Sequence, residues 1–91
     1  MSEHQSITVQ LTNSKGLHAR AAAKFVKTSE TFNADITVAR SGMEVSGLSI
    51  MGLMMLAARC GTQVTIKAEG LEADAALQAL VALVEGKFGE E

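Results

Sequence analysis

The sequence has no proline, tryptophan or tyrosine, only three phenylalanines, and a single cysteine, Cys60. One cysteine excludes a disulfide framework within the chain and a metal site built from several thiolates. Without tryptophan or tyrosine, the chain has little with which to stack nucleic-acid bases. The lack of proline removes the residue that most readily presets the first turn of a helix.

The sequence also lacks a large excess of positive or negative charge. Eight lysines and arginines against ten aspartates and glutamates give a formal net charge of −2. A nucleic-acid-binding surface normally carries surplus positive charge. We therefore expect no nucleic-acid partner.

Long apolar runs are also missing. The longest, residues 48–58, is interrupted by Ser49 and Gly52 and is shorter than the ~20 residues that a membrane-spanning helix needs. The first ten residues are polar and lack the basic start and apolar centre of a secretory signal. With its lone thiol, the chain is expected to be cytoplasmic and not inserted in a membrane.

Ninety-one residues suffice for one domain, because independent domains usually take ~100–200 residues. We expect a single domain, 1–91, that acts as a monomer. A chain of this size can hold one layer of helices over one sheet, but it lacks the bulk for a deep catalytic cavity.

The pattern of apolar residues predicts four strands and three helices. Three β-branched triplets, at 7–9, 36–38 and 64–66, alternate apolar and polar side chains as half-buried strands do. The predicted strands are Ile7–Val9, Asp35–Arg40, Met43–Val45 and Gln63–Glu69, and the predicted helices are His18–Thr31, Ser49–Ala58 and Glu72–Lys87. We expect an α/β (α+β) fold, an open-faced two-layer sandwich in the order β-α-β-β-α-β-α, with a four-stranded antiparallel sheet and three helices on one face. The tail from Gly86 is expected to fray.

Residues 16–20, Gly-Leu-His-Ala-Arg, contain the chemically informative side chains. His18 lies where the chain enters the first helix, and free N–H groups at a helix start favour an anion. Arg20 and Lys24, four residues apart, add positive charge. A histidine in this setting can accept a phosphoryl group, whose oxygens would meet these donors. The alternative is an ordinary surface histidine next to a solvated basic helix face.

Two segments resemble the motifs of a known family. Gly16-Leu17-His18-Ala19-Arg20 resembles the active-site motif of HPr, the histidine-containing phosphocarrier of the bacterial phosphotransferase system. Residues 48–54, Leu-Ser-Ile-Met-Gly-Leu-Met, resemble the regulatory-serine motif of that family at the expected separation. The resemblance covers nearly the whole chain in length and element order.

The resemblance implies a stoichiometric carrier and not an enzyme, with no cofactor and no metal. His18 would take a phosphoryl group on Nδ1 from phosphorylated enzyme I and pass it to an EIIA-type protein. Arg20 would pair with the moving phosphate through its planar fork of donors. Asn13 matches an asparagine often found ahead of the motif, where it would help hold the loop with Gly16, although a plain turn residue is an equal alternative.

Ser49 matches the serine that an HPr kinase/phosphorylase modifies in many bacteria. A serine at this place is also an ordinary helix N-cap, and both roles are compatible. Phosphate there would add ~1.5–2 negative charges at the start of the second helix without breaking it.

The second helix is expected to present a partner-binding surface. In the family, the positions matching Ile50, Met51 and Met54 form an exposed apolar patch beside the histidine, and methionine adapts to several partners. Gly52 would keep this surface low, and Lys24 and Lys27 would add to it. The alternative is that every apolar residue of this helix is core, which we expect for Leu53 and Leu56.

Alanine at position 21 departs from the common family pattern, which has proline there. Two other functions stay open: a regulatory, nitrogen-branch binding module of the same fold that is not linked to sugar uptake, and a small acyl-phosphate hydrolase in which Arg20 binds phosphate. For the hydrolase, only Asn13 could position a water. His4 is expected to be a surface residue in a mobile N-terminus, and Cys60 a small packing residue.

Overall fold

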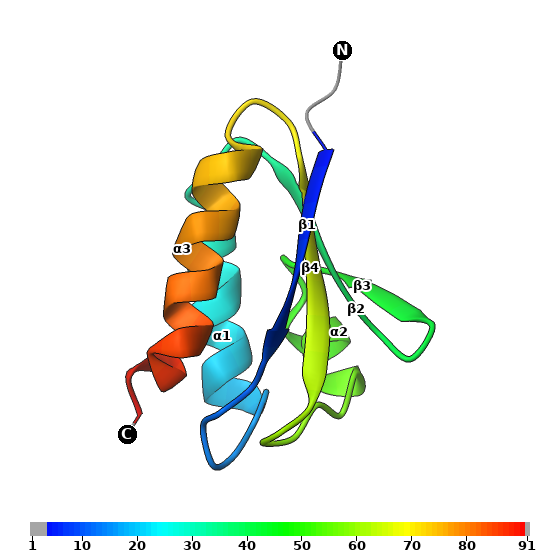
Figure 1. The fold of residues 1–91 in the computed structure, drawn as a ribbon, viewed down its shortest axis with the longest axis vertical. Helices are drawn as coiled ribbons and strands as arrows, with labels where there is room; N and C mark the ends of the chain where they lie inside the picture. The colour runs from blue at the N-terminus through cyan, green and yellow to red at the C-terminus, as the bar shows by residue number, and fades with distance from the viewer. Residues whose placement is uncertain (1–3, 91) are drawn as a thin grey trace.

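Four strands and three α-helices make up most of residues 4–90, the part of the chain that the computed structural model describes (Figure 1). Their order is the predicted β-α-β-β-α-β-α. The strands are β1 (His4–Gln10), β2 (Asp35–Arg40), β3 (Met43–Ser46) and β4 (Gln63–Glu69). The helices are α1 (Ala19–Ser29), α2 (Ile50–Met55) and α3 (Ala73–Glu85), followed by the short 3-10 helix η1 (Lys87–Gly89).

The strands form one antiparallel sheet in the order β1-β4-β2-β3. Central strand β4 places Ile66 opposite Ile7 of β1 and Val38 of β2. The three β-branched triplets therefore lie side by side. Because partners across the strands share a face, their apolar side chains point to the same side of the sheet.

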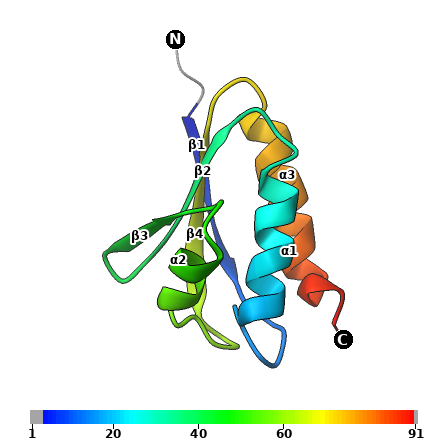
Figure 2. The same ribbon diagram turned by 180° about the vertical axis from the view of Figure 1, so that it is seen from behind.

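That apolar face and the three helices form one core. The sheet contributes Val38 and Ile66, and the helices contribute Phe25 from α1, Leu53 from α2 and Leu80 from α3. Figures 1 and 2 show α1 and α3 side by side along the sheet. The expected open-faced sandwich is confirmed.

The opposite face of the sheet is polar, as the alternating pattern predicts. The hydroxyls of Thr8 and Thr65 lie 2.9 Å apart across β1 and β4. Lys67 of β4 donates to Glu44 of β3 at 2.8 Å.

All three helices are shorter than predicted. Helix α1 begins at Ala19, with His18 as its N-cap residue. Helix α2 ends at Met55 because the chain then leaves the helical region, reaching a φ of 52° at Ala57. None of the helices within residues 4–90 is long and apolar enough to cross a bilayer.

Two residues lie elsewhere than the sequence predicts. His4 begins β1 and pairs with Glu69 of β4, so its assignment to a mobile N-terminus is wrong. Cys60 is exposed, so the prediction of a packing residue is also wrong.

The prediction of a fraying tail from Gly86 is wrong for residues 86–90, while Glu91 lies outside the described residues. Gly86 caps α3, and the chain turns through left-handed φ values of 57° at Lys87 and 55° at Phe88. This turn buries the Phe88 side chain, which is only 1% exposed. The tail thereby returns toward the beginning of α1 (Figure 2).

Candidate functional site

His18 lies at the N-terminus of α1, in an extended backbone conformation. Its carbonyl accepts the first helical hydrogen bond, from Ala22 N at 2.8 Å. The N–H groups of the first turn have no acceptor within the helix, and together with the helix dipole they favour an anion. The first turn also has no acidic residue to oppose one. The His18 side chain, 24% exposed, is accessible beside these donors.

The loop before His18 depends on glycine at position 16. Gly16 has a φ of +61°, and a Cβ there would lie 2.3 Å from Ala58 O and 2.7 Å from Arg59 Cα. The next residue is tied to the same segment, because Leu17 N donates to Ala58 O at 2.9 Å. Both the backbone conformation and this close approach therefore require glycine.

Asn13 holds this loop from the inside. Its side chain is fully buried, and Nδ2 donates to Gly16 O at 2.7 Å and to Glu90 Oε1 at 3.2 Å. The backbone carbonyl of Asn13 accepts from Gly16 N at 3.1 Å. Asn13 thus connects the loop to the C-terminal tail.

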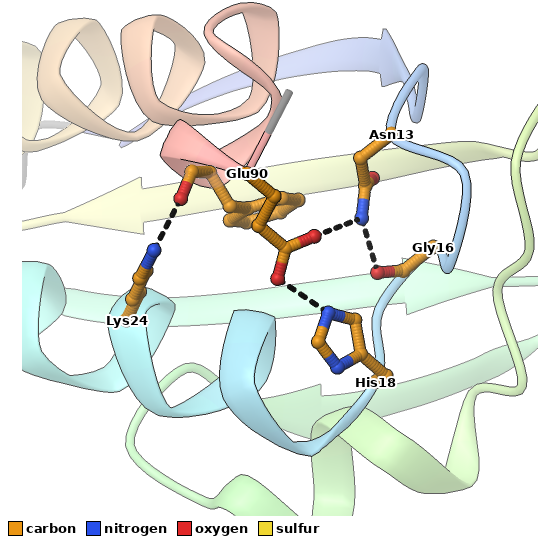
Figure 3. A network of polar contacts seen from close by, with 6 residues as sticks. Asn13, Gly16, His18, Lys24 and Glu90 are labelled. Atoms are coloured by element: carbon orange, nitrogen blue, oxygen red, sulfur yellow. Dashed lines mark hydrogen bonds and ion pairs between the residues drawn. The ribbon is translucent and has the colours of Figure 1, made fainter.

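The Glu90 carboxylate links Asn13 to the histidine (Figure 3). Its Oε2 lies 2.5 Å from His18 Nε2. The tail is held nearby by Lys24, whose Nζ donates to Phe88 O at 2.5 Å. The structure therefore brings together side chains from the loop, from α1 and from the last described residues.

The Glu90 carboxyl is held in its ionised form. Burial by itself raises its pKa, but hydrogen bonds with His18 and Asn13 outweigh that effect, and electrostatic attraction to His18 and Lys24 adds to them. The resulting pKa lies below the ordinary value of 4.5. Near neutral pH the group is a negatively charged hydrogen-bond acceptor.

The three basic residues of α1 lie in different surroundings. Arg20, the second residue of the helix, is exposed and makes no hydrogen bond or ion pair with the described residues. Lys24 is half-buried and bound to the tail. Lys27 is exposed in the last turn, away from the helix start.

Ser49 is the N-cap of α2, where its Oγ accepts a hydrogen bond from Gly52 N at 2.9 Å. A Cβ on Gly52 would lie 3.0 Å from that oxygen. Glycine therefore leaves room for the serine side chain over the first turn.

Helix α2 exposes one apolar side and buries the other. Leu53 and Leu56 are buried, as expected, whereas the other apolar side chains of the helix are exposed. The alternative in which the whole helix is core is therefore wrong. The exposed set, which we call the α2 patch, consists of Leu48, Ile50, Met51, Met54 and Met55. It borders α1, because α2 packs against that helix. Two of its members, Leu48 and Met55, are absent from the predicted surface.

The sequence prediction also missed Glu90 and Phe88. The only sequence signal for them was weak: Phe88 is an apolar residue just beyond the predicted end of the third helix, in a segment between Gly86 and Gly89. Within residues 4–90, no group of three or more His, Cys, Asp or Glu residues is placed to hold a metal ion.

Residues 5–86 match the family model described as the PTS HPr component phosphorylation site. The phosphocarrier protein HPr of Neisseria meningitidis serogroup A is 42% identical over 83 residues, which cover 91% of this chain and 93% of that protein. The phosphocarrier protein NPr of Shewanella violacea is 43% identical over 82 residues, 90% of each chain. The crystal structure of HPr-C-His from Thermoanaerobacter tengcongensis superposes with a TM-score of 0.92 at 44% identity, covering 96% of this chain and 98% of that one.

Proposed function

Since this chain belongs to the HPr family of phosphocarrier proteins of the phosphotransferase system, we propose that His18 carries the phosphoryl group. Phosphorylated enzyme I is the donor, and an EIIA-type protein is the acceptor. The main support is the location of His18, a partly exposed imidazole at the N-terminus of α1 with an exposed arginine two residues on.

The transfer step uses Nδ1 of His18 as the nucleophile. Its lone pair forms a bond to phosphorus while the bond between phosphorus and the phosphorylated atom of the donor breaks, and that donor atom keeps the electron pair. Little covalent chemistry is left for the protein, so rate depends on positioning and on stabilising the phosphoryl oxygens. The first-turn N–H groups of α1 and the Arg20 guanidinium supply donors for those oxygens.

The same arrangement suits a carrier better than a hydrolase. A carrier needs an accessible nucleophile, because each partner contributes the other wall of the site during transfer. A hydrolase must hold a water in line with the phosphorus. Asn13, the residue that could do so, is fully buried, and its Nδ2 is bound to Gly16 and Glu90.

Labelling from phosphoenolpyruvate through the cognate enzyme I tests the proposal. We expect one acid-labile phosphate per wild-type chain and none on His18→Ala. The other histidine provides a matched control, so His4→Ala should still be labelled. Arg20→Ala should be labelled about tenfold more slowly, as for the loss of a charge-assisted hydrogen bond. An unlabelled wild type, or label on His18→Ala, would contradict the proposal.

The α2 patch is proposed as the surface on which enzyme I and EIIA-type partners dock. It is apolar, lies next to α1, and is rich in methionine, whose flexible side chain suits several differently shaped partners. Lys27 adds positive charge on the neighbouring helix.

Phosphorylation of Ser49 is proposed to regulate this docking. A phosphate on Oγ would stay compatible with the start of α2 and would place negative charge next to the patch. We expect Ser49→Asp to slow labelling of His18. Ser49→Asn is the matched control, because both residues are good N-caps and differ in charge. Equal rates for the two variants would argue against regulation by charge at this position.

The NPr relative favours a second candidate, a regulatory protein of the nitrogen-related branch. If the chain serves the nitrogen-related branch, we expect a donor of that branch to label it faster than enzyme I of the sugar branch does. Comparing labelling rates with enzyme I of the sugar branch and its nitrogen-branch counterpart decides between them. A clear preference for the nitrogen-branch donor would assign the chain to regulation and not to sugar uptake.

A further inference from the structure

The proposed transfer step does not use the Glu90 carboxylate. We propose that Glu90 is a positioning residue: it holds the His18 ring in the tautomer and orientation that make Nδ1 the nucleophile. This inference rests on the proposed function, which it extends to a residue 72 positions away in the sequence.

The tautomer follows from the hydrogen bond. A neutral imidazole has one N–H and one nitrogen with a free lone pair. An ionised carboxylate can only accept a hydrogen bond, so the nitrogen that faces Glu90, Nε2, must bear the proton. The lone pair then resides on Nδ1, which Figure 3 shows on the side of the ring away from Glu90.

The carboxylate is itself firmly placed. Its second oxygen, Oε1, accepts from Asn13 Nδ2, so the whole group is oriented from two directions. Burial of Phe88 and the hydrogen bond from Lys24 to the Phe88 carbonyl fix the backbone two residues earlier. Because the Glu90 carboxylate is fixed in this way, the His18 ring that is hydrogen-bonded to it keeps its orientation as it reacts.

Charge gives Glu90 a second effect during transfer. When Nδ1 bonds to phosphorus, the ring becomes positively charged while the proton stays on Nε2. The carboxylate next to that N–H stabilises the developing charge without accepting the proton. Its contact is with Nε2, so it leaves the position at Nδ1 open for the phosphoryl group.

The alternative is that the carboxylate obstructs the site, by repelling the negatively charged phosphoryl group. The two ideas predict opposite changes in rate when the charge is removed. Both can be tested with the full chain carrying Glu90→Ala or Glu90→Gln. Glu85→Gln is the matched control, because Glu85 is an exposed carboxylate near the end of α3 that makes no hydrogen bond or ion pair with the described residues.

The first measurement is independent of any phosphoryl donor. Two-bond ¹H–¹⁵N correlation spectra of the His18 ring, recorded at a pH where it is neutral, distinguish the two tautomers. We expect a single Nε2–H form in the wild type and in Glu85→Gln, and a mixture of both forms in Glu90→Ala. Glu90→Gln retains an acceptor oxygen and should keep most of the Nε2–H form.

The second measurement is the rate of labelling by phosphorylated enzyme I. We expect Glu90→Ala to be slower by about tenfold, in line with a lost hydrogen bond to a charged group, and Glu90→Gln to be intermediate. Unchanged spectra and rate in Glu90→Ala would overturn the inference, and a faster rate would identify the carboxylate as an obstacle. If the wild type takes no label, the proposed function fails, whereas the spectra still decide whether Glu90 sets the tautomer.

Discussion

Replacing Phe88 with alanine tests whether the C-terminal tail is a structural part of the site. The phenyl ring is among the largest fully buried side chains of the protein, at 1% exposure, although it lies only three residues beyond α3. Its burial holds the turn that brings Glu90 to His18. Phe88→Ala therefore acts on stability and on the histidine together.

Two opposing contributions set the loss of stability in Phe88→Ala. Truncating a buried phenylalanine to alanine usually costs about 3–5 kcal/mol when the surroundings stay in place. Here the tail can instead detach, which relieves the left-handed conformations at Lys87 and Phe88, each costing about 1 kcal/mol or more. We expect a loss of about 3 kcal/mol in the free energy of unfolding. For a domain of this size, that corresponds to a Tm lower by roughly 12–24 °C.

Urea unfolding followed by circular dichroism measures the first effect, and the ring resonances of His18 report the second. Phe88→Leu is the control, since it keeps an apolar side chain and should retain most of the stability and the wild-type resonances. A loss below about 1 kcal/mol, with unchanged His18 resonances in Phe88→Ala, would refute the view that Phe88 fixes the tail.

Three further predictions concern the loop, the patch and the carboxylate. Gly16→Ala should lower the free energy of unfolding in urea by about 2–3 kcal/mol, because it adds a backbone clash to a left-handed φ. Gly42→Ala is the control, since it shares the positive φ but has no atom within 4 Å of the new Cβ. An equal loss of stability in both variants would show that the clash at position 16 contributes nothing. Met51→Glu, at a side chain that is 75% exposed, should leave the Tm nearly unchanged and weaken binding to enzyme I in calorimetry, whereas an unfolded variant would show that Met51 is core. The pKa of Glu90 is depressed in the folded chain, so the stabilisation of the docked tail by this carboxylate is complete above pH 4.5 and is lost as the pH falls through the folded-state pKa. Hydrogen exchange of the tail amides should therefore speed up over that pH range in the wild type. Glu90→Gln should lack this pH dependence.

Local patterns predicted the sheet and helices well because each pattern reflects burial of one face. The triplet at 64–66 alternates apolar and polar side chains, and Ile66 indeed packs in the core while Thr65 bonds to Thr8 on the open face. The helix ends were less predictable. Helix α2 stops at Met55 because of the conformation at Ala57, and alanine gives no sequence signal for a positive φ.

The site was predictable only on its N-terminal side. His18, Arg20 and Ser49 occur in short motifs, so their local positions at helix starts could be read from the sequence. The contact between Glu90 and His18 depends on the packing of α3 and on left-handed backbone at Phe88, neither of which a local pattern reveals.

Alanine at position 21 has a structural consequence of its own. Ala21 is the third residue of α1 and is fully buried, so a small apolar side chain fits there without proline. Unlike proline, it also keeps a backbone N–H in the first turn, where an anion would bind.

The return of the tail to His18 matters for anyone who handles the protein. Glu90 lies beside the histidine, so we expect a bulky affinity tag or fluorophore joined to this end of the chain to hinder a phosphoryl donor that docks on His18. Strand β1 begins at the opposite end of the molecule (Figure 1). A label placed ahead of β1 would leave the histidine accessible, which makes the N-terminus the better place to immobilise the chain for binding measurements.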